Sequence, residues 1–396
     1  MKTLLFLAQR LPYPPNKGDK IRSFAVLKHL AKHWRIHLGC FMDDPADRQY
    51  VDALKEFCVD TMCIELNPRA ARLRALRALV KGGPLSEAYF GHARLAAWVR
   101  GVKPDAAFLY SSVMGQYLRA IPRPPRVVMD FVDVDSDKWR QYAERQSWPM
   151  SWVYRREAET LLEFDRAMAQ AADAITFVSE AEAQLFRRQA PEVGAKVHGI
   201  SNGIDLNYFT PGDYPAPFSG PTVVFTGAMD YWPNVDSVTW FGAKILPRIR
   251  ASLPNANFII VGSNPSEEVR RLAELPGVTV TGRVPDVRPY LAHANAVVAP
   301  MRVARGIQNK VLEGMAMGRA VITTPQGLEG IDAEPGRHLL LASGADDFAA
   351  AVLGVLTGPE TQHLGAAARA QMVACYDWSD KLAAFSELLE SGVRQI

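Results

Sequence analysis

The feature that most constrains the fold is an alternation between short apolar runs of strand length and longer segments with helical periodicity. Runs that are apolar at nearly every position are typical of strands buried on both faces. Because parallel strands need a long crossover connection, strands of this kind separated by helices indicate a parallel sheet in an α/β protein. The apolar runs of the N-terminal half are residues 3–7, 35–41, 106–110, 126–130 and 174–178.

The alternation stops at residues 207–217, a segment rich in proline and turn-forming residues that is typical of a linker, and then starts again. We therefore predict two doubly wound domains, residues 1–204 and 205–377, with a C-terminal helix at about 378–396 that packs back on the first domain. Ligands are expected in a cleft between the domains, at the carboxyl ends of the strands. The second series of apolar runs comprises residues 222–226, 257–261, 278–280, 296–299 and 320–323.

Charge and cysteine usage exclude several classes of protein. A net charge of +3 does not favour nucleic-acid binding, so we expect no nucleic-acid partner. No pair of the four cysteines has a C-x2-C spacing, which argues against a metal site and favours reduced thiols in a cytosolic protein. The apolar run at residues 4–8 is too short for a signal peptide or a membrane span, and we expect a cytoplasmic location.

The most informative segment is residues 302–329, which is predicted to form a loop, a helix, a strand and a second loop. Gly306 lets the backbone approach a ligand closely, and a helix that starts nearby offers unpaired N–H groups and the positive end of its dipole. Glu313, two turns into the helix, could accept hydrogen bonds from vicinal hydroxyls such as those of a ribose. Cations are unfavourable at a helix N-terminus, so three of them suggest a bound anion. These cations are Arg302, Arg305 and Lys310. The alternative is a surface helix with a solvated charged face.

These motifs resemble the family-4 glycosyltransferases, which are retaining enzymes of the GT-B fold, and the resemblance covers essentially the whole chain. The pieces that recur in the same order are residues 202–205, 225–227, 260–262, 280–284 and 310–318. Residues 11–24 and 129–139 are similar to the sugar transferases of exosortase-associated (PEP-CTERM) exopolysaccharide clusters. The resemblance implies two Rossmann-like domains that face a central cleft. It also implies transfer of a sugar from a nucleotide diphosphate-sugar to a glycan or lipid-linked acceptor, with no further cofactor and no metal.

The resemblance also implies roles for residues of the 302–329 segment. The family has two glutamates separated by seven residues; the second falls on Glu313, the implied ribose ligand, whereas the first position holds Arg305. An arginine cannot accept a hydrogen bond, so we assign Arg305, with Lys310, to the diphosphate, where their charge would stabilise the leaving group. Gly306 and Ile307 correspond to the backbone donors to the phosphates.

A second departure follows Gly227, where many relatives carry an Arg and a Lys but residues 228–234 of this chain contain no cation. Asn234 is interpreted either as a donor to a phosphate or an acceptor, or as a turn residue after a proline. The positions where the family holds the nucleobase, mainly through backbone groups, are Gly282, Arg283 and Val284.

In the first domain, Gly18 lies in a turn that faces the cleft in GT-B enzymes, and Arg22 is a second candidate there; an ordinary helix N-terminus is the alternative. Four carboxylates crowd the end of the 126–130 run without the glycine and closing glutamate of a calcium loop. We assign Asp133 to the attacking hydroxyl of the acceptor and Asp130 to acceptor binding or to a half-buried structural role. Helix capping is the alternative for the cluster, which comprises Asp130, Asp133, Asp135 and Asp137.

Residues 67–81 combine five cations with leucine and valine and contain no acid. This pattern predicts a basic amphipathic helix, which either binds anionic lipid on the inner face of the cytoplasmic membrane or docks on the sheet through its leucines.

Two other functions are compatible with the same motifs. One is a nucleotide-sugar epimerase of the GT-B type, which would need a histidine or glutamate set in the cleft. The other is a non-catalytic nucleotide-sugar binding module, suggested by Arg305 in place of a glutamate, although Gly306 and Glu313 argue against it.

Overall fold

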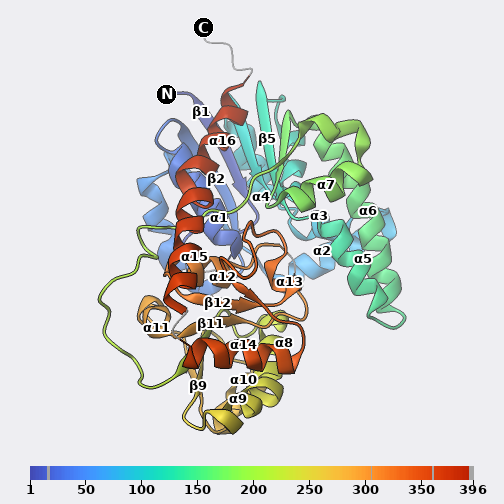
Figure 1. Cartoon of the computed structure of the whole chain (residues 1–396). Helices are drawn as coiled ribbons and strands as arrows, with labels where there is room; N and C mark the ends of the chain where they lie inside the picture. Colours follow the sequence, from blue (N-terminus) through green and yellow to red (C-terminus); the bar gives the residue numbers. More distant parts are fainter. Residues whose placement is uncertain (16–17, 305, 359–360, 392–396) are drawn as a thin grey trace. The chain divides into compact units, whose positions relative to one another are not determined.

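The structure is a computed structural model that describes residues 1–15, 18–304, 306–358 and 361–391. The chain divides into two compact units (Figure 1). The first unit consists of Met1–Ser201 and of the C-terminal segment from Ser379 onward, and the second unit is Asn202–Trp378.

The first unit is built on a seven-stranded sheet with the order β3-β2-β1-β4-β5-β6-β7, in which every neighbouring pair is parallel. The order changes direction between β1 and β4, which is where doubly wound sheets place their ligands. The strands are β1 (Thr3–Ala8), β2 (Arg35–Met42), β3 (Asp60–Glu65), β4 (Ala106–Tyr110), β5 (Arg126–Val132), β6 (Ala174–Phe177) and β7 (Val197–Gly199).

Helices connect these strands, and several begin at side-chain caps that the sequence provides. Asn67 accepts hydrogen bonds from the N–H groups of Arg69 and Ala70 and so starts α2, and Ser179 does the same for Glu182 in α7. The α-helices are α1 (Gly18–Leu30), α2 (Pro68–Lys81), α3 (Leu85–Tyr89), α4 (Ala93–Gly101), α5 (Asp135–Glu144), α6 (Met150–Ala171), α7 (Glu180–Gln189) and α16 (Trp378–Glu390). The 3-10 helices are η1 (Pro45–Glu56), η2 (Ser112–Ala120) and η3 (Pro191–Lys196).

The second unit repeats the same plan with a six-stranded parallel sheet, ordered β10-β9-β8-β11-β12-β13, whose direction changes between β8 and β11. Its strands are β8 (Thr222–Thr226), β9 (Asn257–Val261), β10 (Val278–Gly282), β11 (Ala296–Ala299), β12 (Ala320–Thr323) and β13 (Leu340–Leu341). Its helices are α8 (Trp232–Trp240), the π-helix η4 (Phe241–Ile245), α9 (Leu246–Ser252), α10 (Glu267–Arg271), the 3-10 helix η5 (Leu272–Glu274), α11 (Arg288–His293), α12 (Asn309–Ala316), α13 (Pro325–Leu328), α14 (Ala345–Thr357) and α15 (Thr361–Cys375).

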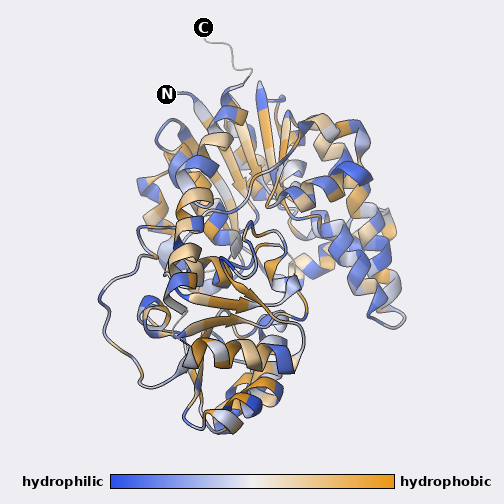
Figure 2. Cartoon of the chain, in the orientation of Figure 1, coloured by the Kyte–Doolittle hydropathy of each residue, from blue (hydrophilic) through white to orange (hydrophobic). Residues whose placement is uncertain are grey.

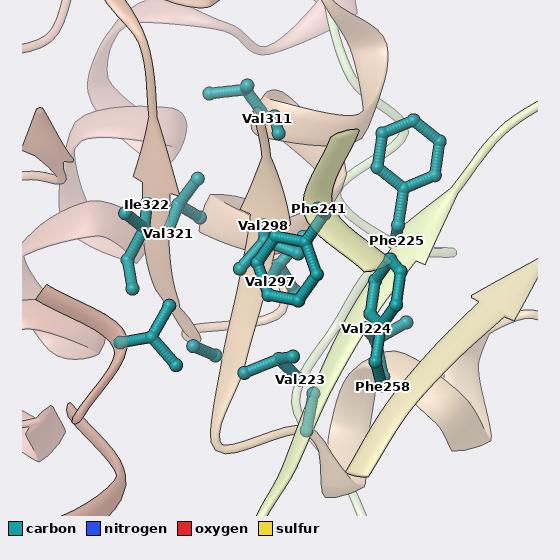
Figure 3. Packing of buried hydrophobic residues seen from close by; sticks show 14 of the residues in the cluster. Val223, Val224, Phe225, Phe241, Phe258, Val297, Val298, Val311, Val321 and Ile322 are labelled. Carbon is teal, nitrogen blue, oxygen red and sulfur yellow. The ribbon is translucent and has the colours of Figure 1, made fainter. Parts of the chain in front are cut away.

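The central strands of both units are buried along nearly their whole length and are mainly hydrophobic, as the predicted apolar runs require (Figure 2). In the second unit, residues of β8, β11 and β12 form a buried layer against which Phe241 of η4 and Val311 of α12 pack (Figure 3). Gly314 lets α12 lie close to this sheet, because a Cβ there would be 2.9 Å from the Cβ of Val297 and 3.0 Å from Val321. The position of α12 is therefore fixed by a backbone-to-sheet contact.

A buried ion pair holds several elements of the first unit together. The Arg22 guanidinium on α1 donates to both carboxylate oxygens of Asp130 on β5, over 2.7 and 3.2 Å. It also donates to the carbonyl of Ile200 over 2.8 Å and lies 5.2 Å from the ring centroid of Phe385 on α16. Both charged side chains are completely buried. We therefore assign Arg22 and Asp130 a structural role in place of the acceptor contact that the sequence suggested.

Removing one partner of this pair should strongly destabilise the first unit, because the other charge would stay buried without compensation. We expect Arg22→Met to lower the free energy of unfolding by about 3–5 kcal/mol, measured by urea titration. The control is Lys55→Met, which breaks the exposed pair with Asp52 and should change stability little. Equal effects of the two substitutions would contradict the structural assignment.

Candidate functional site

Three adjacent strands of the second unit run into glycines at the carboxyl edge of the sheet: Gly227 after β8, Gly262 after β9 and Gly282 at the end of β10. The backbone N–H of Gly227 donates to the carbonyl of Val261 over 3.0 Å, and that of Gly262 donates to Gly282 over 3.2 Å. Gly227 and Gly282 have φ values of +155° and +69°, and a Cβ at Gly262 would overlap the carbonyl oxygen of Gly227. This edge is thus formed by closely packed backbone. The Asn234 side chain lies against Gly227, whereas nothing lies within 4 Å of a Cβ placed at Gly282, so a ligand can approach the backbone closely there.

Helix α12 begins beside this edge. It starts at Asn309, slightly later than predicted, after Gly306 with a φ of +63° and without a side-chain cap from Gln308. Arg302, which the sequence placed among the cations at this helix, instead donates over 3.0 Å to Asp236 on α8. Arg305 lies outside the described residues.

Of the cations described in this segment, Lys310 is the one that is buried. Its Nζ donates to the amide oxygen of Gln308 over 3.1 Å and lies 5.3 Å from the ring centroid of Phe225 on β8. Burial lowers the pKa of Lys310 to about 8, and the nearby Glu313 opposes this change. A buried ammonium whose hydrogen-bond acceptor is a neutral amide favours the binding of an anion, because an anion would compensate the lost solvation.

Glu313 follows on the same helix and reaches the end of β8. Thr226, the last residue of that strand, donates to Glu313 Oε2 over 3.2 Å. Burial raises the pKa of Glu313, whereas the bond from Thr226 and the charge of Lys310 lower it. A carboxylate with one such bond retains acceptor capacity for further hydroxyl donors. The structure thus brings together Lys310, Glu313 and the glycine after β8.

The other predicted donor residues differ in how they are held. Asn234 is buried and donates to the carbonyl of Ala228 over 2.9 Å, which supports its interpretation as a residue that shapes the turn, while its side-chain oxygen has no hydrogen-bond partner. Ile307 and Val284 are partly buried against the hydrophobic core. Arg283 is exposed.

The first unit has a cavity of about 180 Å³ at the carboxyl ends of β1, β4 and β5, next to the point where the strand order changes. Its lining residues are Gln9, Arg10, Ser23, Tyr110, Ser111, Phe131, Val132, Asp133 and Asp135. Ser111 and Val132 have φ values of +78° and +71°, a left-handed conformation that is a genuine outlier for a β-branched residue. Backbone strain of this kind gathers at functional sites. Sequence analysis missed both residues, since a φ value leaves no signature in the sequence.

The carboxylates near this cavity bind cations of the protein. Asp133 and Asp135 both accept hydrogen bonds from Lys138, over 2.7 and 3.0 Å. Burial lowers the pKa of Lys138, but the two carboxylates outweigh this effect and raise it above its usual value. Asp137 pairs with Arg140. The second oxygen of Asp133 is buried and has no hydrogen-bond partner, so it keeps unused acceptor capacity. No sequence pattern pointed to Lys138. Gly18, the other acceptor candidate, is the first residue of α1.

Comparisons with known proteins agree with this architecture. Residues 220–358 match the family model described as Glycosyl transferases group 1. The chain is 31% identical over 213 residues to the phosphatidyl-myo-inositol mannosyltransferase of Mycolicibacterium smegmatis, a stretch that covers 50% of this chain and 53% of the relative. The chain thus spans about half the length of the curated relative that it matches.

Solved structures resemble the chain over its whole length. Sucrose-phosphate synthase from Thermosynechococcus elongatus has a TM-score of 0.73 at 19% identity and covers 99% of both chains. HepE of Anabaena, in complex with UDP and glucose, has a TM-score of 0.69 at 16% identity and covers 99% of this chain and 100% of its own. The predicted fold class is confirmed: the protein consists of two Rossmann-like α/β units and has the fold of the GT-B glycosyltransferases.

The lowered pKa of Lys310 should make stability depend on pH. The unfolded lysine titrates near 10.5 and the folded one near 8, so between these values the unfolded state binds more protons and stability rises with pH. Relative to Lys310→Met, the wild type should gain about 3 kcal/mol between pH 7.5 and 10.5, at about 1.4 kcal/mol per pH unit. Urea unfolding measures this, and the exposed Lys244→Met is the control that should show no such difference.

Proposed function

We propose that the protein is a retaining glycosyltransferase that moves a sugar from a nucleotide diphosphate-sugar to a glycan or lipid-linked acceptor in exopolysaccharide biosynthesis. The observation that carries the proposal is the sheet edge of the second unit, where the buried Lys310 and the half-buried Glu313 lie beside the glycine-rich ends of the strands. The family match over residues 220–358 and a structural neighbour solved with UDP-glucose, HepE, support a nucleotide-sugar donor.

In this proposal each donor residue acts on a different part of the nucleotide sugar. Lys310 and Arg305 stabilise the negative charge that grows on the leaving diphosphate, together with the backbone N–H groups at the start of α12. Glu313 accepts hydrogen bonds from the ribose hydroxyls, and residues 282–284 hold the base through their backbone. Departure of the diphosphate leaves an oxocarbenium-like sugar, which the acceptor hydroxyl attacks on the same face.

We place the acceptor in the cavity of the first unit. Asp133 lines this cavity, one of its carboxylate oxygens has no hydrogen-bond partner, and Lys138 fixes the other oxygen. The carboxylate is therefore oriented to accept a hydrogen bond from the attacking hydroxyl. Gly18, at the start of α1, is the second acceptor residue of the proposal.

The proposal includes a membrane contact because a lipid-linked acceptor is held in the membrane, and the enzyme has to bind there to reach it. Helix α2 turns three apolar side chains, Leu73, Leu76 and Val80, toward solvent. This exposure supports contact with anionic lipid on the inner face of the cytoplasmic membrane over docking on the sheet.

The test is a panel of nucleotide diphosphate-sugars incubated with the protein. A ligand that binds the native state alone raises the unfolding temperature, which selects the donor base. Release of the nucleotide diphosphate and the anomeric configuration of the product, determined by NMR, then establish transfer with retention. An inverted product would contradict the retaining mechanism, an altered sugar still attached to the nucleotide would indicate an epimerase, and binding without any reaction would indicate a binding module.

Replacing the ribose ligand should weaken donor binding. We expect Glu313→Gln to lower the affinity for the nucleotide diphosphate selected above by roughly fivefold to tenfold, because a charged acceptor becomes a neutral one. Calorimetry measures the affinity, and the exposed Glu274→Gln serves as the control. Unchanged affinity in Glu313→Gln would remove this residue from the donor site.

Removing the diphosphate cations should affect the chemical step more than binding. Lys310→Ala and Arg305→Ala should each lower kcat by about 10²–10³-fold with a smaller rise in KM, since the charge matters most in the transition state. Lys244→Ala is the matched control on the surface of the same unit. Arg305→Glu restores the residue that the family carries but sets a carboxylate beside phosphate, so it should stay inactive. Wild-type turnover in Arg305→Glu would show that Arg305 does not serve the diphosphate.

A further inference from the structure

Helix α2 of the first unit carries an apolar stripe on its outer face. Leu73, Leu76 and Val80 are 60%, 58% and 90% exposed, and their spacing of three and four residues places them on one side of the helix. The side that packs on the protein is formed by small residues instead, with Ala71 and Ala78 buried. The leucine docking that the sequence left open is therefore wrong for Leu73 and Leu76.

Positive charge surrounds this stripe. Arg69, Arg72 and Arg77 are exposed on the same helix, and residues 67–86 contain no Asp or Glu. Arg74 points the other way, since it donates to the carbonyl of Tyr89 at the end of α3 over 3.0 Å. The outer face of α2 thus combines apolar side chains with cations that have no acidic neighbours in the segment.

A second apolar group lies at the tip of the hairpin between α5 and α6. Trp148 and Trp152 are 80% and 54% exposed, and Met150 between them is also exposed. Residues 145–156 contain three arginines and no acid. The hairpin itself is held by aromatic packing, with the ring centroids of Trp139 and Tyr154 5.1 Å apart. Two large indole side chains are therefore presented on an ordered hairpin.

The two apolar groups are neighbours on one unit. Arg156 of α6 donates to the carbonyls of Ala78 and Gly83, both over 3.2 Å, at the C-terminal end of α2. Trp152 precedes Arg156 by four residues and so lies on the same side of α6. Figure 1 shows α2, α3 and α6 lying together. The C-terminal end of α2 therefore lies close to the part of α6 that carries Trp152.

We propose that these side chains form one membrane-binding surface that inserts into the headgroup region of an anionic bilayer. The surface consists of Leu73, Leu76, Val80, Trp148, Met150 and Trp152. Soluble proteins rarely expose this many large apolar side chains on neighbouring elements, and tryptophan is enriched where a bilayer meets water. The bordering arginines match the negative surface of such a bilayer. Among the described residues, none of the helices has the length and apolar character of a membrane span.

This proposal extends the membrane contact of α2 made above to the hairpin, and its test does not depend on catalysis. The full chain is mixed with sedimenting vesicles of phosphatidylcholine alone or with added phosphatidylglycerol. Wild type should sediment with the anionic vesicles, and high salt should release it, because salt screens the arginines. Lipids brominated near the headgroup should quench its tryptophan fluorescence.

Variants separate the aromatic and the electrostatic parts of the surface. Trp148→Ser/Trp152→Ser should lower vesicle partitioning by about tenfold or more at low salt and abolish most of the quenching. Arg69→Gln/Arg72→Gln/Arg77→Gln should lower it roughly a hundredfold, at about fivefold for each arginine. The control is Val59→Ser/Val373→Ser, which removes two other exposed apolar side chains and should bind as wild type does.

Three outcomes would overturn the proposal. The first is tryptophan-variant binding and quenching equal to wild type. The second is a wild type that binds neither kind of vesicle. The third is self-association that the tryptophan substitutions abolish, which would make the surface an interface between copies. Circular dichroism and the urea midpoint show that each variant is folded. Vesicle binding without any sugar transfer would disprove the proposed function and leave the surface standing, so the two failures are distinguishable.

Discussion

Both units depend on the same constraint: a parallel sheet that helices cover on both faces leaves only the ends of its strands open for chemistry. In the second unit the carboxyl ends of β8, β9 and β10 are closed by glycines, so backbone lines the edge. In the first unit the corresponding edge is hollowed beside β1, β4 and β5. The helices are needed to bury the apolar strands, and the same burial confines binding residues to the loops at these edges.

Helix α12 shows how packing produces an electrostatic site. Gly314 removes the side chain that would separate the helix from β11 and β12, and the close approach buries the first turn of the helix with Lys310 in it. Burial of a cation costs free energy, which Glu313 offsets only in part, so the pKa of Lys310 falls to about 8. The folded protein therefore holds a desolvated positive charge, whose most favourable partner is a bound anion.

Some charged residues of the first unit form ion pairs in the core, and others lie at the edge of the cavity. Arg22 and Asp130 form an ion pair inside the core, where they join α1, β5 and the segment after β7. Asp133, a few residues further on, stays at the edge of the cavity with one oxygen bound by Lys138 and the other without a partner. Asp130 and Asp133 look equivalent along the chain. Their positions at the end of β5 decide that one has a structural role and that the other stays available for chemistry.

The sequence by itself determined the two parallel α/β units, because fully apolar runs separated by helices can be buried in few other ways. It also indicated Lys310 and Glu313, since their spacing on one helix is a local property. Tertiary structure alone decided which charges are neutralised: it paired Arg302 with Asp236, Arg22 with Asp130, and Lys138 with Asp133. It also created the strained turns at Ser111 and Val132 and exposed the leucines of α2. Ion pairing, backbone strain and exposure arise between segments distant in the chain, so no local pattern contains them.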